Sequence, residues 1–422
     1  MLMMVVMSLY TVVDGIFVAR LVGTDAFSAV NIVYPLLSMV IALGTMLGAG
    51  TAALVAKKLG EGRQREANEN LSFIVLVASI AGAVISAVTW LFLDSIMYAL
   101  GANEAIFAYC RDYAFPLLFF LPASILQLAF QNLFVANGKP TVGLIVTVIG
   151  GLANVVLDYV FIALCDMGIA GAAWATGIGF CIPAVYGLGY FTCKRTASLY
   201  FVKPSADWKA LLKSVTNGSS EMVSALSTSV TTFLFNITMM RFAGPEGVAA
   251  IAILLYLDFV LVALNLGYSL GVAPLFSFNY GRKNEPGLRK LFRISVGFCA
   301  CTGGAVTVGT MVFAGELAAI FTPRGSAVHT MSEFGLRVFA AGYLFKGFSI
   351  FASALFTAFS NGAVSALLSF MRTLVFLVAS LLGLTALFGV DGVWFASPLA
   401  EALAFILSLA MVRIYRPVYR YA

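Results

Sequence analysis

The chain has few of the residues that charge a soluble surface or carry out most catalysis. Only 10% of its 422 residues are Asp, Glu, Lys or Arg, and it contains a single histidine. Soluble domains carry roughly 25% charged residues, so this composition excludes an ordinary soluble fold. No stretch matches the phosphate-binding pattern G-x-x-x-x-G-K-[ST], so the sequence gives no support for a nucleotide-driven reaction.

Cysteine is also scarce, and its spacing is not typical of a metal centre or a disulfide framework. We interpret the six cysteines, which are scattered over several predicted helices, as buried apolar residues. They are Cys110, Cys165, Cys181, Cys193, Cys299 and Cys301. The histidine, His329, is predicted in an outer loop, where no nucleophile, base and orienting group come together. We therefore expect neither an enzyme nor a cofactor.

Long apolar runs are what the chain does contain. Hydrophobic residues make up 61% of the sequence, and the mean hydropathy is +0.99. Each run is long enough for the roughly 20 residues that a helix needs to cross the hydrocarbon of a bilayer. Twelve such runs are centred near residues 12, 44, 81, 123, 152, 180, 229, 263, 301, 346, 376 and 404. The sequence predicts an all-α polytopic membrane protein with twelve transmembrane helices.

The net charge of +6 is distributed as a signal of topology. When loops are placed alternately on the two sides of the membrane, 18 of the 25 Lys and Arg residues fall on one side. Cytoplasmic loops are rich in Lys and Arg, so both termini are predicted in the cytoplasm. The 18 residues are Lys57, Lys58, Arg63, Arg65, Lys139, Lys194, Arg195, Lys203, Lys209, Lys213, Arg282, Lys283, Arg289, Lys290, Arg293, Arg413, Arg416 and Arg420.

Short patterns recur at a nearly constant offset, which indicates an internal repeat. Arg20-Leu-Val-Gly23 returns as Arg241-Phe-Ala-Gly244, an offset of 241 − 20 = 221, and GIAGAAWAT ending at Thr176 returns as GVDGVWFAS ending at Ser397, again 221. The repeat predicts two six-helix halves in the same orientation: an N-lobe over residues 1–193, a cytoplasmic linker over 194–213, and a C-lobe over 214–422. Parallel halves with a substrate route between them are typical of alternating-access carriers.

The repeat also predicts a short first helix. Residue 1 corresponds to residue 222, although the seventh apolar run begins near Val215. The first helix is therefore expected to lack about two turns relative to its repeat partner.

Two acids within apolar runs are candidates for function. Asp158 lies in the run VGLIVTVIGGLANVVLDYVFIAL, with Asn154 one turn earlier on the same face, and Asp14 lies in the first run. A charged side chain at bilayer depth costs roughly 2.5 to 3.5 kcal/mol on insertion scales, and it usually marks an ion or proton pathway. Asp14, Asp158 and Thr176 each lie eight or nine residues from the outer turn of their own helix, roughly 12 to 14 Å deep. We predict that they meet in one layer.

The order and spacing of motifs along essentially the whole chain resemble the multidrug and toxic compound extrusion family, MATE. The motifs are VVDGIFVARLVGTDAFSAV, a GKP at residues 138–140, NVVLD, GIAGAAWAT, FNITMMRFAGPEGVAA, GVAPLFSFNYGRKN and GVWFASPLAEALA. The resemblance implies two pseudo-symmetric six-helix bundles in a V shape. It also implies efflux of varied small molecules, often cationic, in exchange for Na⁺ or H⁺.

The resemblance further implies a cation-coupling site in the N-lobe, formed by Asp14, Asn154, Asp158 and Thr176. Two carboxylates, an amide oxygen and a hydroxyl suit Na⁺, which as a hard cation prefers oxygen ligands, and nearby carboxylates suit a shared proton equally well. We expect a drug-like substrate, a position in the plasma membrane, a monomer, and no nucleic-acid partner.

The C-lobe does not repeat these acids, because the offset of 221 takes Asp158 to Ala379. It instead has Asp258, Lys346 and Glu401 in apolar runs, with Arg372 nearby, and we predict an ion-paired cluster that lines a substrate path or simply neutralises itself. The main alternative function is a flippase for lipid-linked precursors, which has a related architecture. Such a flippase is expected to present several bases to its cavity.

Overall fold

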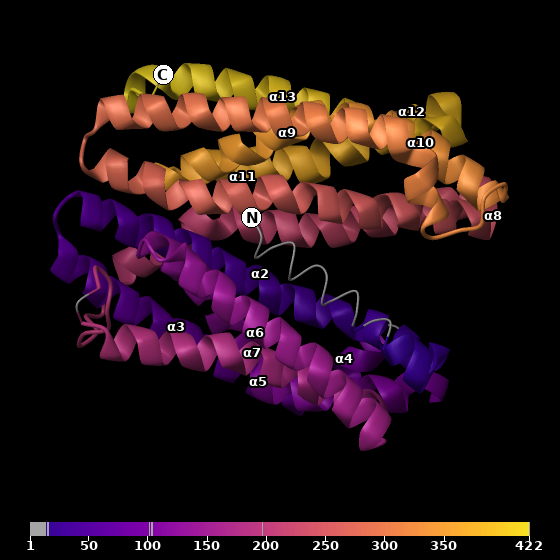
Figure 1. Cartoon of the computed structure of the whole chain (residues 1–422), viewed down its shortest axis with the longest axis horizontal. Helices are drawn as coiled ribbons and strands as arrows, with labels where there is room; N and C mark the ends of the chain where they lie inside the picture. The colour runs from indigo at the N-terminus through magenta and orange to yellow at the C-terminus, as the bar shows by residue number, and fades with distance from the viewer. Residues whose placement is uncertain (1–13, 15–16, 101, 103, 196, 422) are drawn as a thin grey trace. The chain divides into compact units, whose positions relative to one another are not determined.

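The computed structural model describes residues 14, 17–100, 102, 104–195 and 197–421, and these residues form helices and short connections without a strand (Figure 1). Labels α denote α-helices and η denote π-helical segments. The elements are η1 (Val18–Val22), α2 (Thr24–Gly60), α3 (Gln64–Leu91), α4 (Leu93–Ala99), α5 (Glu104–Ala136), α6 (Pro140–Asp158), η2 (Tyr159–Leu164), α7 (Gly168–Cys193), α8 (Trp208–Gly281), α9 (Glu285–Ala319), α10 (Ala327–Ala358), α11 (Gly362–Phe370), η3 (Met371–Phe376), α12 (Leu377–Phe388) and α13 (Val390–Tyr419).

Ten helices in the described part of the chain are long and apolar enough to cross a membrane. The prediction of a polytopic, all-helical membrane protein is therefore confirmed. The first of the twelve predicted runs, with its expected shortening, lies mostly outside the described residues.

One of the ten, α8, contains two of the predicted runs. Its 74 residues would extend about 110 Å as a straight helix, far more than a bilayer spans. The helix is interrupted at Gly244, whose φ of 63° and ψ of −157° are accessible to glycine but strained for other residues, and Pro245 follows. The chain therefore turns at the Arg241–Gly244 motif that the repeat places between two spans.

The described residues divide into two compact units between Gly218 and Ser219, here called the N-unit and the C-unit. In the N-unit, α5 packs against α2, α3 and α7, and α6 packs against α7. In the C-unit, α10 packs against α9 and α13. The predicted linker is irregular up to Asp207, and α8 begins at Trp208.

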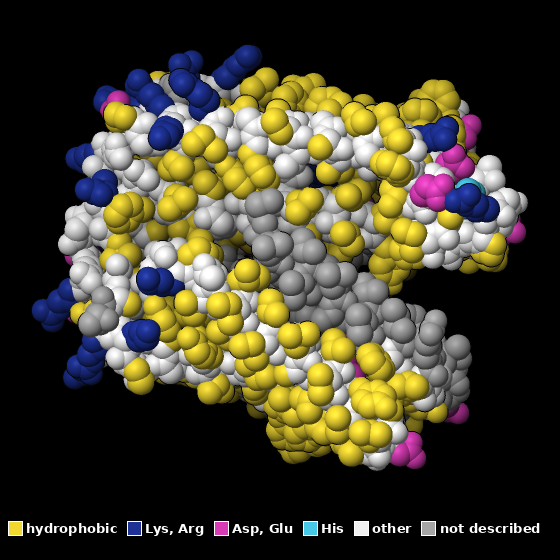
Figure 2. All heavy atoms as spheres, viewed as in Figure 1, with side chains coloured by type: hydrophobic (Ala, Val, Ile, Leu, Met, Phe, Trp, Pro, Cys, Tyr) yellow, Lys and Arg dark blue, Asp and Glu magenta, His cyan; other side chains and the backbone are white. Residues whose placement is uncertain are grey.

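Charge is unevenly distributed within each unit. Figure 2 shows, for each unit taken by itself, Lys and Arg side chains gathered mainly toward one end and acidic side chains more frequent toward the other. Apolar side chains cover much of the visible flank between the ends. An apolar belt between charged ends is the distribution that a bilayer requires.

Two predictions about scarce residues are wrong. Cys165, Cys193 and Cys301 are exposed rather than buried, although all six cysteines are free thiols. Lipid tails are as apolar as a protein core, so an apolar residue on a membrane helix can face either one. His329 lies in the first turn of α10 rather than in a loop, because the Ser326 hydroxyl caps this helix by accepting a hydrogen bond from the His329 backbone N–H at 3.1 Å.

Candidate functional site

Helix α6 has its apolar side chains facing out and its polar ones facing in, the reverse of a helix at a soluble surface. Ile145, Ile149, Leu152 and Val156 recur every three or four residues, and each is at least half exposed. The opposite face is buried and includes Thr147, Gly150, Gly151, Asn154 and Asp158. This pattern is typical of a helix with one side in lipid and its polar side in the protein interior.

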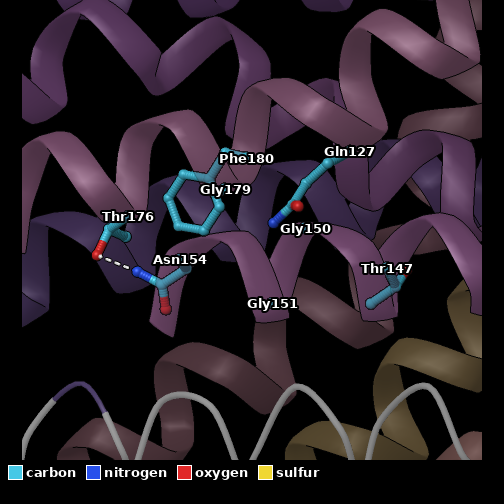
Figure 3. Close-up of a pocket in the computed structure, with 8 residues that line it drawn as sticks. All are labelled: Gln127, Thr147, Gly150, Gly151, Asn154, Thr176, Gly179 and Phe180. Atoms are coloured by element: carbon cyan, nitrogen blue, oxygen red, sulfur yellow. Dashed lines mark hydrogen bonds between the residues drawn. The ribbon is translucent and has the colours of Figure 1, made fainter. Parts of the chain in front are cut away.

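Two glycines allow α6 and α7 to approach closely beside Asn154. A Cβ added to Gly150 would lie 2.8 Å from the Gly179 carbonyl oxygen, and one added to Gly179 would lie 3.1 Å from Asn154 Cβ. Small residues permit such contact between membrane helices. The approach places Asn154 next to Thr176, and Asn154 Nδ2 donates a weak hydrogen bond to Thr176 Oγ1 at 3.4 Å (Figure 3).

Asp158 is fully buried, and Asn154 is 2% exposed. The carboxyl groups of Asp158 and Asp14 lie close enough to share a proton. Two ionised carboxylates only accept hydrogen bonds, so they cannot satisfy each other. Among the described residues, four buried oxygens here have no hydrogen-bond partner: both of Asp158, Oδ1 of Asp14 and Oδ1 of Asn154.

Buried polar atoms without partners are rare in folded proteins, and each calls for an explanation such as a ligand or an ion. The four oxygens of this site offer hard ligands to Na⁺ and acceptors to a proton. In the described part of the chain, no group of three or more His, Cys, Asp or Glu side chains could hold a metal ion. The oxygens present at this site belong to two carboxylates, an amide and a hydroxyl.

A small pocket adjoins Asn154 and Thr176 and continues along α6 (Figure 3). The distance from Asn154 to Thr147, seven residues along the helix, is about 10 Å. The pocket thus runs from Asn154 toward the Pro140 end of α6. The lining consists of Gln127, Thr147, Gly150, Gly151, Asn154, Thr176, Gly179 and Phe180.

Sequence reasoning missed Tyr113 of α5. This side chain is 2% exposed and lies within electrostatic reach of both Asp14 and Asp158. A tyrosine in an apolar run is ordinarily a core residue with a polar tip, and no motif separated Tyr113 from the other aromatics.

The π-helical segments were also missed, and each adjoins a charged candidate. Asp158 directly precedes η2, Asp14 lies four residues before η1, and Arg372 is the second residue of η3. A π-turn adds a residue to the helix and disturbs its regular backbone hydrogen bonding, and such turns occur frequently at functional sites.

The C-unit brings together the charges predicted there. Lys346 Nζ of α10 lies 2.8 and 2.9 Å from the two carboxylate oxygens of Asp258 on α8. It is also 3.7 Å from Glu401 Oε1 on α13, and Arg372 Nη1 lies 3.3 Å from that same oxygen. All four side chains are largely buried, with Asp258 the most exposed at 21%.

The family model MatE matches residues 1–160 and 222–410, with one stretch in each unit. The chain belongs to the MatE family. The resemblance read from its motifs is thereby confirmed.

Relatives of this MatE chain match nearly its full length at low identity. The multidrug export protein MepA of Staphylococcus aureus (strain NCTC 8325 / PS 47) is 23% identical over 413 residues, which is 97% of this chain and 90% of MepA. A crystal structure of MATE in complex with MaL6 has a TM-score of 0.94 at 24% identity, covering 100% of this chain and 95% of that one. An outward-facing conformation of a multidrug resistance MATE family transporter has a TM-score of 0.93, also at 24% identity. These structures establish the fold.

Proposed function

We propose that the chain is a secondary antiporter of the plasma membrane. It exports small cationic or amphipathic molecules in exchange for Na⁺ or H⁺ by alternating access between its two lobes. It acts as a monomer with both termini in the cytoplasm, and it needs a coupling ion but no cofactor. Family membership and the description of MepA as a multidrug export protein support this substrate class.

The observation that carries the proposal is the pair of buried acids in the N-unit. Asp158 is fully buried, both of its oxygens lack partners, and Asp14 lies within interaction distance. Two adjacent ionised carboxylates repel each other and are costly to bury. A bound Na⁺ or proton removes part of that cost. Entry of the ion can therefore favour one conformation of the lobe and its release another, which is the coupling that an antiporter needs.

Asn154 and Thr176 complete the proposed site. The Asn154 amide donates to Thr176, and this orients its own unpartnered Oδ1. The adjoining pocket extends along α6 from Asn154 to Thr147. We assign Asp14 and Asp158 as the titratable ligands, and Asn154 and Thr176 as neutral ligands.

The flippase alternative is less well supported. A flippase for pyrophosphate-linked lipids needs bases that can bind phosphate oxygens. The intramembrane bases seen in the C-unit, Lys346 and Arg372, both interact with acids.

Transport in proteoliposomes tests the proposal. Purified protein is reconstituted, and efflux of a fluorescent cationic dye is measured with an inward Na⁺ gradient or an inward H⁺ gradient imposed separately. We expect dye efflux with at least one of the gradients and none without a gradient. Dye movement independent of both gradients, or movement of a pyrophosphate-linked lipid instead of dye, would contradict the antiporter assignment.

A further inference from the structure

The charged cluster of the C-unit is defined here as Asp258, Lys346, Arg372 and Glu401. The two bases are not distributed evenly over the Glu401 carboxylate. Arg372 Nη1 and Lys346 Nζ both approach Oε1, at 3.3 and 3.7 Å. Oε2 is buried and has no hydrogen-bond partner among the described residues. The Glu401 side chain is only 9% exposed, so this oxygen has little access to water.

A second unpartnered group lies beside it. Tyr343 of α10 is 5% exposed, and its hydroxyl makes no hydrogen bond within the described residues. The hydroxyl lies close to the Asp258 carboxylate and within electrostatic reach of Glu401, and no donor to its oxygen is found among the described residues. Lys346 Nζ lies 5.9 Å from the centre of the Tyr343 ring. The cluster therefore contains two acceptors, a carboxylate oxygen and a phenol oxygen, that lack donors.

A further acid lies near the cluster. Glu221 of α8 is within electrostatic reach of Arg372. Within the cluster itself, the acids Asp258 and Glu401 are matched in number by the bases Lys346 and Arg372. Intramembrane charges are usually neutralised by a partner or belong to a substrate path.

Four elements meet at this point: α8, α10, η3 and α13. Gly342 allows α13 to pass close to α10, since a Cβ added there would lie 3.4 Å from Pro398 Cα and 3.9 Å from Glu401 Cγ. The cluster is not sealed, because Asp258 keeps 21% of its side-chain surface exposed and Arg372 keeps 14%.

We propose that Glu401 Oε2 and the Tyr343 hydroxyl recognise substrates through a protonated amine that carries N–H groups. The inference rests on the proposed function and narrows its substrate class. An ammonium group supplies the missing donors, and the N–H bond it donates to Glu401 is charge-assisted. A quaternary ammonium supplies the charge alone. The C-unit therefore discriminates between two cations of equal charge by their hydrogens.

Binding of a matched pair of probes tests the discrimination. Monodansylcadaverine carries a primary ammonium, and its trimethylammonium derivative carries the same charge on the same chain without N–H. Fluorescence anisotropy of each probe is measured with the full chain in lipid nanodiscs. The wild-type protein should bind the primary ammonium about tenfold more tightly or better, the ratio expected for a hydrogen bond to a charged group.

Three variants locate the preference. Glu401→Gln keeps the shape of the side chain and the Oε1 acceptor but removes the charge, so the preference should fall to about twofold or less, through weaker binding of the primary ammonium. Tyr343→Phe, which leaves every charge in place, should reduce the preference about threefold and remains informative if Glu401→Gln does not fold. Glu333→Gln is the matched control, since this acid lies on α10 outside the cluster and pairs with Arg337. It should bind both probes as the wild-type protein does.

The outcomes separate this inference from the antiporter assignment. Equal affinity of the wild-type protein for the two probes overturns the inference. An equal loss of affinity for both probes in Glu401→Gln overturns it as well. A change in the protein's fluorescence on addition of Na⁺ that is lost in Glu401→Gln and kept in Asp158→Asn also overturns the inference, because Glu401 would then bind the inorganic ion. Absence of gradient-driven efflux of either probe from wild-type proteoliposomes contradicts the antiporter function while leaving the binding preference intact.

Discussion

Replacing Asp158 by Asn is the most direct perturbation of the N-unit site. The substitution keeps the size of the side chain but removes the titratable charge from a position with no exposed surface. An interaction with a charged group contributes about 1.5 to 3 kcal/mol, which corresponds to a tenfold to hundredfold loss of ion affinity. Gradient-driven efflux should fall by at least about tenfold. The fold should persist, since a neutral amide is less costly to bury than a carboxylate.

The assay is dye efflux from proteoliposomes with the Na⁺ and H⁺ gradients imposed separately, alongside thermal unfolding of the purified variant. Asp14→Asn should give the same loss. The double variant should be hardly worse than either single one, because residues that act as one unit show non-additive effects.

Two controls accompany this test. Asp166→Asn changes an exposed acid just beyond η2, at a φ of 52° that Asn tolerates, and should leave transport unchanged. Ala379→Asp, which restores an acid at the repeat-equivalent position in the C-lobe, should not rescue Asp158→Asn. Wild-type efflux by Asp158→Asn under both gradients would refute the N-unit cation site and direct attention to the C-unit cluster.

Three further predictions follow from the geometry. Gly179→Ala should destabilise the protein by about 1 to 3 kcal/mol and impair efflux, because the added Cβ would press on Asn154. The control Gly189→Ala lies on the same helix, where an added Cβ meets nothing within 4 Å, and this variant should unfold at the wild-type temperature. Equal melting temperatures for the two variants would show that the α6–α7 approach is not tight. Tyr113→Phe should weaken ion-driven efflux about threefold to tenfold by removing a hydroxyl within electrostatic reach of both acids, and a wild-type efflux rate would exclude that role. In a cysteine-free background, single cysteines introduced at Lys58, Lys203 and Lys283 should be protected in intact cells from an impermeant thiol reagent. Single cysteines introduced at Asp166 and Glu246 should react with it. The opposite pattern would reverse the predicted orientation.

Hydropathy predicted the spans well because the requirement behind it is simple. A stretch such as Gln64–Leu91 or Pro140–Leu164 must be apolar and about 20 residues long to cross a bilayer, and few other structures share that requirement. The same simplicity limits what hydropathy resolves. It cannot distinguish a residue facing lipid from one facing the protein interior, so the prediction of buried cysteines was wrong for Cys165, Cys193 and Cys301.

The candidate sites show a similar division. An intramembrane charge is unusual enough for Asp158, Asp258, Lys346 and Glu401 to be found from sequence, since each needs a partner or a function. Their pairing depends on tertiary contacts: 346 − 258 = 88 residues separate Lys346 from Asp258 along the chain, and their bidentate contact could not be read from spacing. Tyr113 escaped notice because an apolar run conceals an aromatic, and the π-turns escaped because no residue type specifies them.

The two units solve the problem of buried charge differently, and the difference bears on coupling. In the N-unit, Asp14 and Asp158 lie close together, and no base is among the described groups that interact with them, an arrangement that suits the mobile cation proposed for this site. In the C-unit, Lys346 and Arg372 supply permanent positive charge, and one carboxylate oxygen is left over. An ion that is gained and lost in each cycle suits the first arrangement, and a substrate that donates hydrogen bonds to fixed acceptors suits the second. The unequal halves of the repeat therefore fit a division of labour in which the N-unit binds the coupling ion and the C-unit selects the cargo.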